Sequence, residues 1–373
     1  MNSHKRIGKM SAADTWYSRT SEKCSRRNFL SGAALAGAAA LVGESGSAFA
    51  STADSGRPFK VCVFADLHYF PGVMTNSEDT SFLELIMARA EREKCDMMLQ
   101  LGDFVHEVKS ARTRQFVKMY NDFKIPGFHC LGNHDQDGNP YELTCEAYRM
   151  PREGYYFVDR GGFRFVVTDP NYIRMPDGKF VHFSSGNYFK RPKGSSINWL
   201  PPEQMEWLRS TIVGSPYPCI VSAHQSYERM LRTGAVGNSE DVRALFNEAN
   251  AKKPGTVRAV LNGHHHVDNL RLIDNILYWD VNSANDIWFA AVHKCYPAEF
   301  LKKCRSAGHI LAWDKPLSAV LSLWPDGRIK IDGMRCDWLF GISPEKAGLR
   351  QYDGDARRYT CEIKSADLTL NFG

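Results

Sequence analysis

The residues best suited to chemistry in this sequence occur in five short strings, each placed where an apolar run ends. The strings are Asp66-Leu67-His68, Gly102-Asp103, Gly132-Asn133-His134-Asp135, His224, and Gly263-His264-His265-His266. Together they offer carboxylates, an amide oxygen and several imidazoles, all of which are metal ligands. A carboxylate can bridge two cations because each of its oxygens can bind one. The set is therefore sufficient for two metal ions that share a ligand, an arrangement that suits hydrolysis at phosphorus.

The spacing within two of the strings predicts shared faces. Asp66 and His68 are two residues apart, so in extended backbone both side chains leave the same face and can bind one ion. By the same alternation, we expect His264 and His266 to face one cluster while His265 points away.

The remaining strings add further ligands and one catalytic candidate. Asp103 follows Gly102 at a predicted turn, where a missing side chain lets the backbone come close to a metal. Asn133 offers a neutral amide oxygen, and His134 beside it remains available for catalysis. The donors are nitrogen and oxygen without thiolate, which favours Mn, Fe, Zn or Co over Cu(I). Mn is our first expectation, followed by Fe and Zn. Histidine binds a metal only when neutral, so activity should fall in acid.

Alternating apolar runs and amphipathic periods predict the elements that position these strings. Strands are expected at 59–64, 97–101, 125–131, 219–222 and 257–261. Helices are expected from Ser81, over 112–123, from Pro201-Pro202 and from Ser239. This alternation indicates parallel βαβ units, with chemistry outside the carboxyl ends of the strands. Hairpins are predicted at 159–162 and 325–327, a further strand near 359–363, and a long irregular insertion over 170–198.

The first 50 residues are expected to be a targeting segment outside the fold. Residues 25–30 are typical of a twin-arginine signal, a mildly apolar run follows over 32–43, and Ala48-Phe49-Ala50 is an A-x-A cleavage signal. The apolar run is too short and too rich in Gly and Ala for a stable membrane span. We expect export by the twin-arginine machinery to the periplasm or extracellular space, and a linker over 51–57. The alternative is a cytosolic chain with a disordered basic tail.

The leader also holds most of the basic charge. It has seven Lys and Arg against three Asp and Glu, a net of +4, which leaves +1 of the total +5 for the rest. Because the rest of the chain is nearly neutral, it gives no sign of the basic surface with which proteins bind nucleic acids. Roughly 320 residues remain, which suits one large α/β domain.

Nine of the ten cysteines follow the leader. Three lie inside apolar runs, where cysteine acts as a small buried hydrophobe: Cys62, Cys130 and Cys219. Two pairs are the better candidates for disulfides, if any form: Cys295 with Cys304, and Cys336 with Cys361.

The five strings, in this order and spacing, resemble the calcineurin-like metallophosphoesterase superfamily over roughly residues 58–335, with an extension at 336–373. The layout is similar to that of class III cyclic nucleotide phosphodiesterases. The resemblance implies an α/β fold, a four-layer α/β/β/α sandwich of two mixed sheets, with two divalent metal ions at the strand edge. The ligands of the first ion would be Asp66, His68, Asp103 and His266, and those of the second Asp103, Asn133, His224 and His264. His134 would protonate or polarise the leaving-group oxygen, and Asp135 would orient its imidazole.

Four features fall outside the family pattern. Family members often follow the lone histidine with proline, whereas Gln225-Ser226 follow His224 here. The resemblance therefore does not predict the shape of the neighbouring pocket wall. His106 and His129 are not family ligands and are expected to be structural. Asp169 is expected either to contact residues of the site from outside or to stabilise the fold.

We expect an exported enzyme that hydrolyses small phosphorylated substrates, specifically phosphodiesters or nucleotide-like compounds, by in-line attack of a metal-bridging hydroxide. An aromatic-rich segment could stack a base or sugar, or simply cover the sheet; its aromatic residues are Tyr172, Phe180, Phe183, Tyr188 and Phe189. The alternatives are a phosphomonoesterase on the same site and a non-catalytic metal-binding scaffold. Loss of Asn133 or His134 would point to the scaffold, and both are present. A purely structural metal site would normally include Cys ligands.

Overall fold

In the computed structural model, the described residues are 56–76, 78–137, 139–185, 190–228, 234–288, 295–349 and 359–372. The chain divides into two compact units, residues 1–56 and 57–373. The twin-arginine motif and the cleavage signal lie outside the described residues, as does most of the predicted linker. None of the helices in the described ranges combines the length and apolar character that a bilayer crossing requires.

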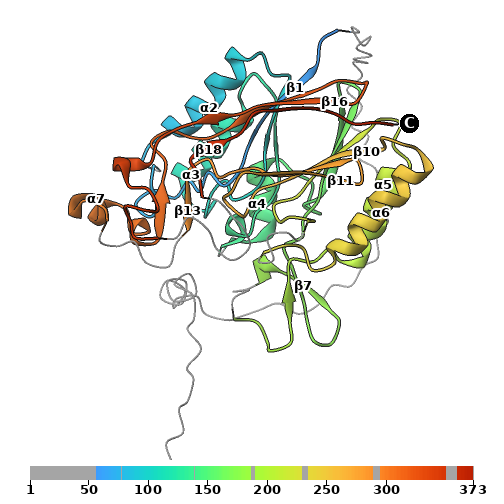
Figure 1. Cartoon of the computed structure of the whole chain (residues 1–373). Helices are drawn as coiled ribbons and strands as arrows, with labels where there is room; N and C mark the ends of the chain where they lie inside the picture. The colour runs from blue at the N-terminus through green and yellow to red at the C-terminus, as the bar shows by residue number, and fades with distance from the viewer. Residues whose placement is uncertain are drawn as a thin grey trace, which may run out of the picture. The chain divides into compact units, whose positions relative to one another are not determined.

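Two six-stranded mixed sheets form the body of the second unit (Figure 1). The first has the order β19-β16-β15-β1-β2-β3. Its strands are β1 (Phe59–Phe64), β2 (Met97–Gln100), β3 (Gly127–His129), β15 (Ala319–Leu323), β16 (Arg328–Asp332) and β19 (Ala366–Thr369). β1, β2 and β3 run parallel as predicted, whereas β15 pairs with β1 antiparallel. The carboxyl ends of β1, β2 and β3 therefore meet at one edge.

The second sheet has the order β11-β12-β10-β9-β5-β4. Its strands are β4 (Tyr156–Arg160), β5 (Phe163–Val167), β9 (Cys219–Ser222), β10 (Val257–Asn262), β11 (Asn269–Ile273) and β12 (Ile276–Asp280). β5, β9, β10 and β12 are parallel, so β9 and β10 also end at a common edge. The predicted hairpin between β4 and β5 turns through Gly161 and Gly162, whose φ values of 58° and 80° suit glycine.

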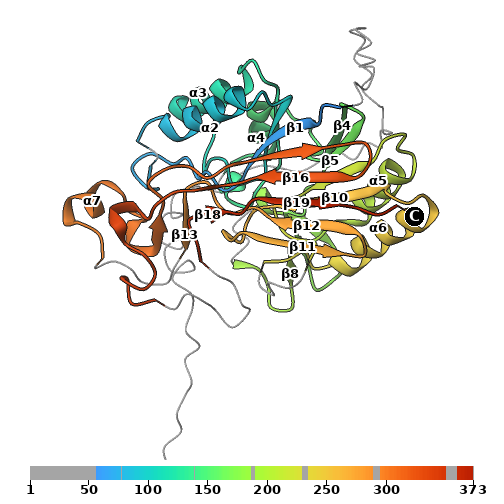
Figure 2. The same ribbon diagram turned by 45° about the horizontal axis from the view of Figure 1, so that its top comes forward.

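Helices cover the outer face of each sheet, which confirms the four-layer α/β/β/α prediction (Figure 2). The first sheet is covered by α2 (Ser81–Arg92), α3 (Ala111–Asn121) and α4 (Tyr141–Tyr148), and the second by α5 (Pro202–Val213) and α6 (Ser239–Lys252). Strand β1 shows how alternation builds the layers. Val61 and Val63 enter the core between the sheets, whereas Cys62 and Phe64 pack under the helices.

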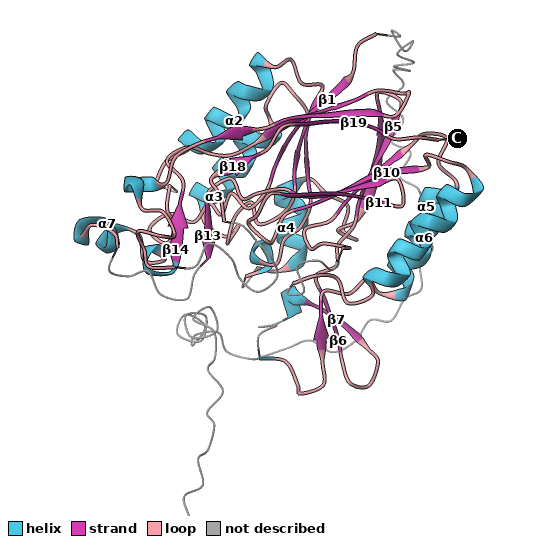
Figure 3. Ribbon diagram, in the orientation of Figure 1, coloured by secondary structure: helices cyan, strands magenta, loops and turns pink. Residues whose placement is uncertain are grey.

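Several elements escaped prediction from the sequence (Figure 3). The described parts of the insertion predicted as irregular contain a small sheet of β6 (Tyr172–Arg174), β7 (Phe180–His182) and β8 (Ser196–Ile197). Strands of two or three residues are too short to show alternation. The same holds for β13 (Asp286–Trp288), β14 (Ile310–Ala312) and β17 (Met334–Arg335), and α7 (Ala298–Lys303) is also short. The strand predicted near 359–363 is present as β18 (Glu362–Ile363). In the C-terminal extension, β19 pairs with β16 and β18 pairs with β17.

All nine cysteines of the described residues are thiols. Cys62, Cys130 and Cys219 are fully buried, as predicted. Cys336 and Cys361 continue the β17–β18 register, and the Cys336 N–H donates to the Cys361 carbonyl at 3.0 Å.

Candidate metal centre

The five strings converge at one edge of the sandwich, because each follows a strand that ends there. The Asp66 N–H donates to the Gly102 carbonyl at 3.0 Å, and the Gly263 N–H donates to the His224 carbonyl at 3.1 Å. The two sheets are joined by the His264 N–H, which donates to Asp66 Oδ2 at 3.0 Å. Side chains separated by about 200 residues in sequence thus share one site.

The backbone at this edge is left-handed rather than extended. Five of the predicted ligands have φ between 51° and 69°: Asp66, His68, Asp103, His264 and His266. The expectation of extended backbone within the first and last strings is therefore wrong, because the strands end before them. Such conformations cost on the order of 1–3 kcal/mol each for residues other than glycine, and they cluster at functional sites.

Three buried side chains form the first donor group, Asp66, His68 and His266, whose ligand atoms lie within 4.8 Å of one another. His266 Nε2 is 3.2 Å from Asp66 Oδ1 and 3.2 Å from His68 Nε2. Ring nitrogens and carboxylate oxygens that converge in this way form a cage suited to a cation.

The second donor group is Asp103, His224 and His264, again with ligand atoms within 4.8 Å of one another. His224 Nε2 is 3.1 Å from Asp103 Oδ2 and 3.2 Å from His264 Nδ1. The same Asp103 oxygen is 3.9 Å from His68 Nε2 of the first group. Asp103 therefore faces both groups, which is the position required of a bridging carboxylate.

Asn133 is 6% exposed and lies in the loop that touches the Asp103 carboxylate. The backbone N–H of the next residue, His134, donates to Asp103 Oδ1 at 2.7 Å. This contact holds the loop that carries Asn133 against the Asp103 carboxylate.

Contacts behind the imidazoles fix which nitrogen faces the cage. His224 Nδ1 is 2.8 Å from the Leu101 carbonyl, and His266 Nδ1 is 2.6 Å from the Asp286 carbonyl. A carbonyl oxygen only accepts, so Nδ1 carries the hydrogen in both rings. In the neutral ring Nε2 then presents its lone pair to the cage, as metal ligation requires. The donor set and its orientation therefore fit divalent metals.

The pKa values divide the four histidines into two kinds. Burial lowers the pKa of His68 and of His264 well below the ordinary value. Burial also acts on His224, but the Asp103 carboxylate outweighs it and raises the pKa to about 9. The Asp66 carboxylate likewise outweighs burial and raises the pKa of His266. Within each donor group, the pKa of one imidazole is therefore lowered and that of the other is raised.

The prediction that Asp135 orients the His134 imidazole is wrong. Asp135 is fully buried, and its oxygens accept hydrogen bonds from the backbone N–H groups of Asp103, Val105 and Gly132 and from the Tyr148 hydroxyl. Asp135 therefore joins the loop after β2 to the loop after β3. The partner of His134 is Asp137, whose Oδ2 lies 2.6 Å from His134 Nδ1.

Asp137 also sets the charge of His134. Burial lowers the pKa of this histidine, but the Asp137 carboxylate, with help from Asp103, raises it to about 9. Asp137 was missed because it lies beyond the motif. A 3-10 helix over His134–Gln136 brings residues three apart onto one side, which places Asp137 against the ring.

His106, expected to be structural, supports a predicted ligand directly. Its Nε2 is 2.8 Å from His68 Nδ1, and its Nδ1 is 3.7 Å from Asp137 Oδ2. With the Nε2 lone pair of His68 in the cage, the hydrogen on Nδ1 donates to His106. The remaining hydrogen of His106 then faces the Asp137 carboxylate.

The other two residues set apart from the pattern stabilise the surroundings. His129 is buried between Gln100 and Asn121, with ring nitrogens 2.9 and 2.8 Å from their amide groups. Asp169 accepts hydrogen bonds from the backbone and side chain of Asn171 and contacts His182 at 3.0 Å.

Three motif glycines leave room for ligands of other strings. A Cβ atom on Gly132 would lie 2.1 Å from Asp103 Oδ1, and one on Gly263 would lie 2.5 Å from Asp66 Oδ2. A Cβ on Gly102 would meet the His224 ring at 2.4 Å. The expectation that Gly102 lets the backbone approach a metal is corrected accordingly, since the space is filled by His224.

A cavity of about 190 Å³ opens beside the donor groups. Its walls include His264 and His266 of the cage together with two aromatic residues, Trp288 and Tyr359. The aromatic segment 171–199 gives a mixed result. Phe183 is buried in a small satellite core, whereas Tyr172 and Phe180 line a separate cavity. Tyr188 and Phe189 lie outside the described residues.

Sequence comparison decides the family. The family model for calcineurin-like phosphoesterases matches residues 59–268, more than half of the chain. The chain belongs to the calcineurin-like phosphoesterase family. Membership makes this phosphoesterase a metal-dependent hydrolase of phosphate esters, with a candidate dimetal site. Curated proteins provide no significant match to its sequence.

Comparison with solved structures finds several that are similar to this phosphoesterase. A dimetal phosphatase from Danio rerio has a TM-score of 0.53 at 12% identity, covering 84% of this chain and 100% of that chain. The GAP50 anchor of the Plasmodium inner membrane complex has a TM-score of 0.48 at 12% identity, covering 84% and 90%. A purple acid phosphatase from yellow lupin seeds has a TM-score of 0.42 at 14% identity, covering 74% and 51%. The first likeness supports the fold assignment.

Proposed function

We propose that this phosphoesterase binds two divalent cations and hydrolyses phosphodiesters, including nucleotide-like compounds. The first donor group, completed by Asp103, would hold one ion, and the second donor group, completed by Asn133, would hold the other. Mn is our first choice, with Fe and Zn as alternatives. When bound, such cations neutralise phosphoryl oxygens and acidify water.

One observation carries the proposal: two donor groups, with five of their six side chains buried, share the Asp103 carboxylate. Backbone carbonyls accept hydrogen bonds from Nδ1 of His224 and His266. Five of the predicted ligands have positive φ, a conformation that residues other than glycine avoid. Strain and convergence of this kind are difficult to explain by folding alone. They fit a site built to hold metals in a fixed arrangement.

His134 is the proposed general acid for the leaving group. Its pKa of about 9 keeps it protonated at neutral pH, because the Asp137 carboxylate stabilises the imidazolium. The Asp137 contact occupies Nδ1 and leaves Nε2 to donate to the departing oxygen. A positioned acid of this kind contributes roughly 10²–10⁴ in rate.

The walls of the adjoining cavity favour a diester over a monoester. None of the described residues that line it is Lys or Arg. A dianionic monoester would gain no side-chain cation there, whereas a monoanionic diester demands less positive charge. The cavity also gives the second ester substituent a place to lie.

We further propose export by the twin-arginine route to the periplasm or the extracellular space. The support is the motif at 25–30 and the cleavage signal at 48–50, read from the sequence. Cell fractionation of a tagged full-length chain, with an Arg26→Lys, Arg27→Lys variant beside it, tests this. Export that is unaffected by the double substitution would contradict it.

Turnover of bis-p-nitrophenyl phosphate and of p-nitrophenyl phosphate, each with added Mn²⁺, tests the reaction. We expect a higher kcat/KM for the diester, and loss of both activities together with metal in Asp103→Asn. Asp177→Asn, a change at an exposed turn, is the matched control and should retain both. Turnover of the monoester alone would refute the diester preference, and full activity after metal removal would refute the metal mechanism.

A further inference from the structure

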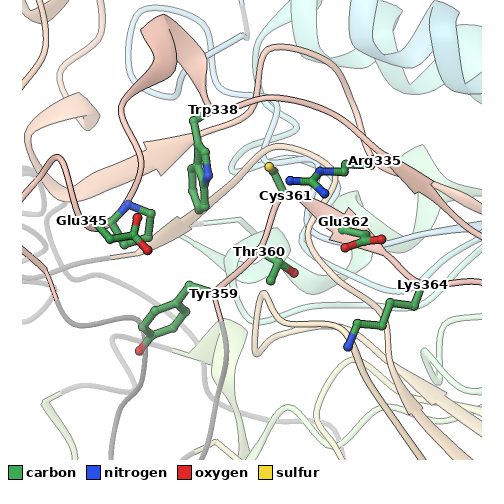
Figure 4. A pocket seen from close by; sticks show the side chains of 9 residues that line it. Arg335, Trp338, Glu345, Tyr359, Thr360, Cys361, Glu362 and Lys364 are labelled. Atoms are coloured by element: carbon green, nitrogen blue, oxygen red, sulfur yellow. The ribbon is translucent and has the colours of Figure 1, made fainter.

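We propose that the C-terminal extension builds a subsite for a planar heterocycle of the nucleobase class, carried by one substituent of the phosphodiester. The proposal rests on the function proposed above and names the chemistry of its substrate. Its location is a cavity of about 330 Å³ lined by Arg335, Trp338, Tyr359, Glu362 and Lys364, among others (Figure 4). The volume lies at the lower end of the range for small-ligand sites, about 300–1,000 Å³.

The cavity adjoins the candidate metal centre. Tyr359 lines both this cavity and the smaller one walled by His264 and His266. The two cavities therefore share a wall, and a substrate with its phosphate at the donor groups could extend one substituent past Tyr359. Among the described residues, the aromatic side chains of segment 171–199 do not provide this continuity, since the cavity at Tyr172 and Phe180 shares no lining residue with either.

The walls are fixed in place. Trp338 packs edge-on against the fully buried Trp313, with ring centroids 4.8 Å apart and planes at 67°. The segment that contains Thr360 and Glu362 is anchored by Asn282, which is buried. Its side-chain amide donates to the Thr360 carbonyl at 2.7 Å and to the Glu362 carbonyl at 3.0 Å. A preorganised pocket loses less entropy when it binds a ligand.

The segment that contains Asn282 also contacts the candidate metal centre. Asn282 is followed by Ser283, whose hydroxyl donates to the backbone carbonyl of Asp66 at 2.9 Å. Two lining residues of the cavity, Thr360 and Glu362, and Asp66 of the first donor group are therefore held by adjacent residues of one segment. Their spacing is set by the fold, as positioning of a two-part substrate requires.

The side chains indicate the class of ligand. In Figure 4, Trp338 and Tyr359 lie on one side of the cavity, and Arg335, Glu362 and Lys364 lie on the other. Aromatic rings stack on the faces of planar heterocycles. Carboxylates accept hydrogen bonds from exocyclic amino groups, and cationic side chains donate to ring nitrogens and carbonyls. With both signs of charge present, the cavity suits a polar neutral ring better than an alkyl chain or a second phosphate.

The test compares two diesters with the same leaving group. Thymidine 5′-(p-nitrophenyl phosphate) carries a base, whereas ethyl p-nitrophenyl phosphate does not. We expect the wild-type kcat/KM ratio of the two to favour the nucleoside ester by about tenfold or more, as one stacked base would provide. Trp338→Ala should reduce that ratio about tenfold, mainly through KM. Trp324→Ala is the matched control, a half-buried tryptophan near the β15–β16 hairpin, and should leave the ratio unchanged.

The outcomes separate this inference from the proposed function. Hydrolysis of the ethyl ester without preference for the nucleoside ester overturns the subsite and leaves the phosphodiesterase intact. A ratio that falls in Phe180→Leu but not in Trp338→Ala places the base elsewhere and also overturns it. Calorimetric binding of thymidine 5′-monophosphate to Mn²⁺-loaded protein gives a readout without turnover, and it should weaken in Trp338→Ala. Lys364→Ala, at an exposed position, provides a second variant should Trp338→Ala fail to fold.

Discussion

Replacing Gly132 by alanine should displace the bridging carboxylate. The added Cβ would lie 2.1 Å from Asp103 Oδ1 and 2.2 Å from the Asp103 backbone nitrogen, where ordinary contacts begin at 3.4 Å. The two segments cannot simply separate, because Asp135 Oδ2 accepts from both the Gly132 N–H at 2.8 Å and the Asp103 N–H at 3.0 Å. Relief of the overlap therefore requires Asp103 to move by more than 1 Å or these hydrogen bonds to break.

A displacement of that size at the shared ligand should be costly for catalysis. Misplacement by about 1 Å reduces rates on the order of 10²-fold, so we expect kcat to fall by at least about 10². The metal content of Gly132→Ala should also fall, because Asp103 faces both donor groups. Plasma emission spectroscopy gives the metal content, and turnover of the diester gives kcat.

The control is Gly56→Ala, at a glycine without positive φ whose added Cβ would meet nothing within 4 Å. It should keep full metal and activity, while circular dichroism confirms that both variants fold. If Gly132→Ala retains its metals and more than half of its kcat, the close packing of Gly132 against Asp103 is not needed to position the Asp103 carboxylate.

Three further outcomes follow from the donor geometry. His134→Ala should keep its metals and lose roughly 10²–10⁴ in kcat; loss of metal would show that His134 is a ligand instead. Asp137→Asn should lower the pKa of His134, so the alkaline limb of the pH–rate profile, where the acid loses its proton, should move to lower pH by about one unit. An unchanged limb would exclude Asp137 as the partner. Dialysis against a chelator should abolish turnover, with recovery on Mn²⁺ addition; activity that survives complete metal removal would contradict the proposed mechanism.

The sequence was sufficient to predict which ligand strings meet, because strand ends are readable from apolar runs. β1, β2, β9 and β10 end where the runs end, and parallel strands bring their carboxyl ends to one edge. Local backbone conformation was not readable. Reasoning by alternation assumes extended chain, whereas Asp66 and His68 have φ values of 53° and 52°.

The partners of the ligands depended on tertiary contacts that no motif reveals. Asp135 is adjacent to His134 in sequence, yet it joins the two loops, and the turn of the 3-10 helix brings Asp137 to the ring instead. Similarly, the wall of the cavity at Trp338 and Tyr359 comes from the C-terminal extension, where pairing of the short strands β17 and β18 joins segments that are distant in sequence.

The carboxylates of the two donor groups also act on the imidazoles beside them. Asp66 raises the pKa of His266 in the first donor group, and Asp103 raises the pKa of His224 to about 9 in the second. For His224 this ion pair contributes its full stability below the unfolded pKa near 6.5 and loses it as pH rises towards about 9. A metal that binds Nε2 of these histidines must displace the proton there, so we expect metal affinity to rise with pH. The carboxylates that raise the pKa of His224 and His266 are therefore the same groups that make metal uptake sensitive to acid.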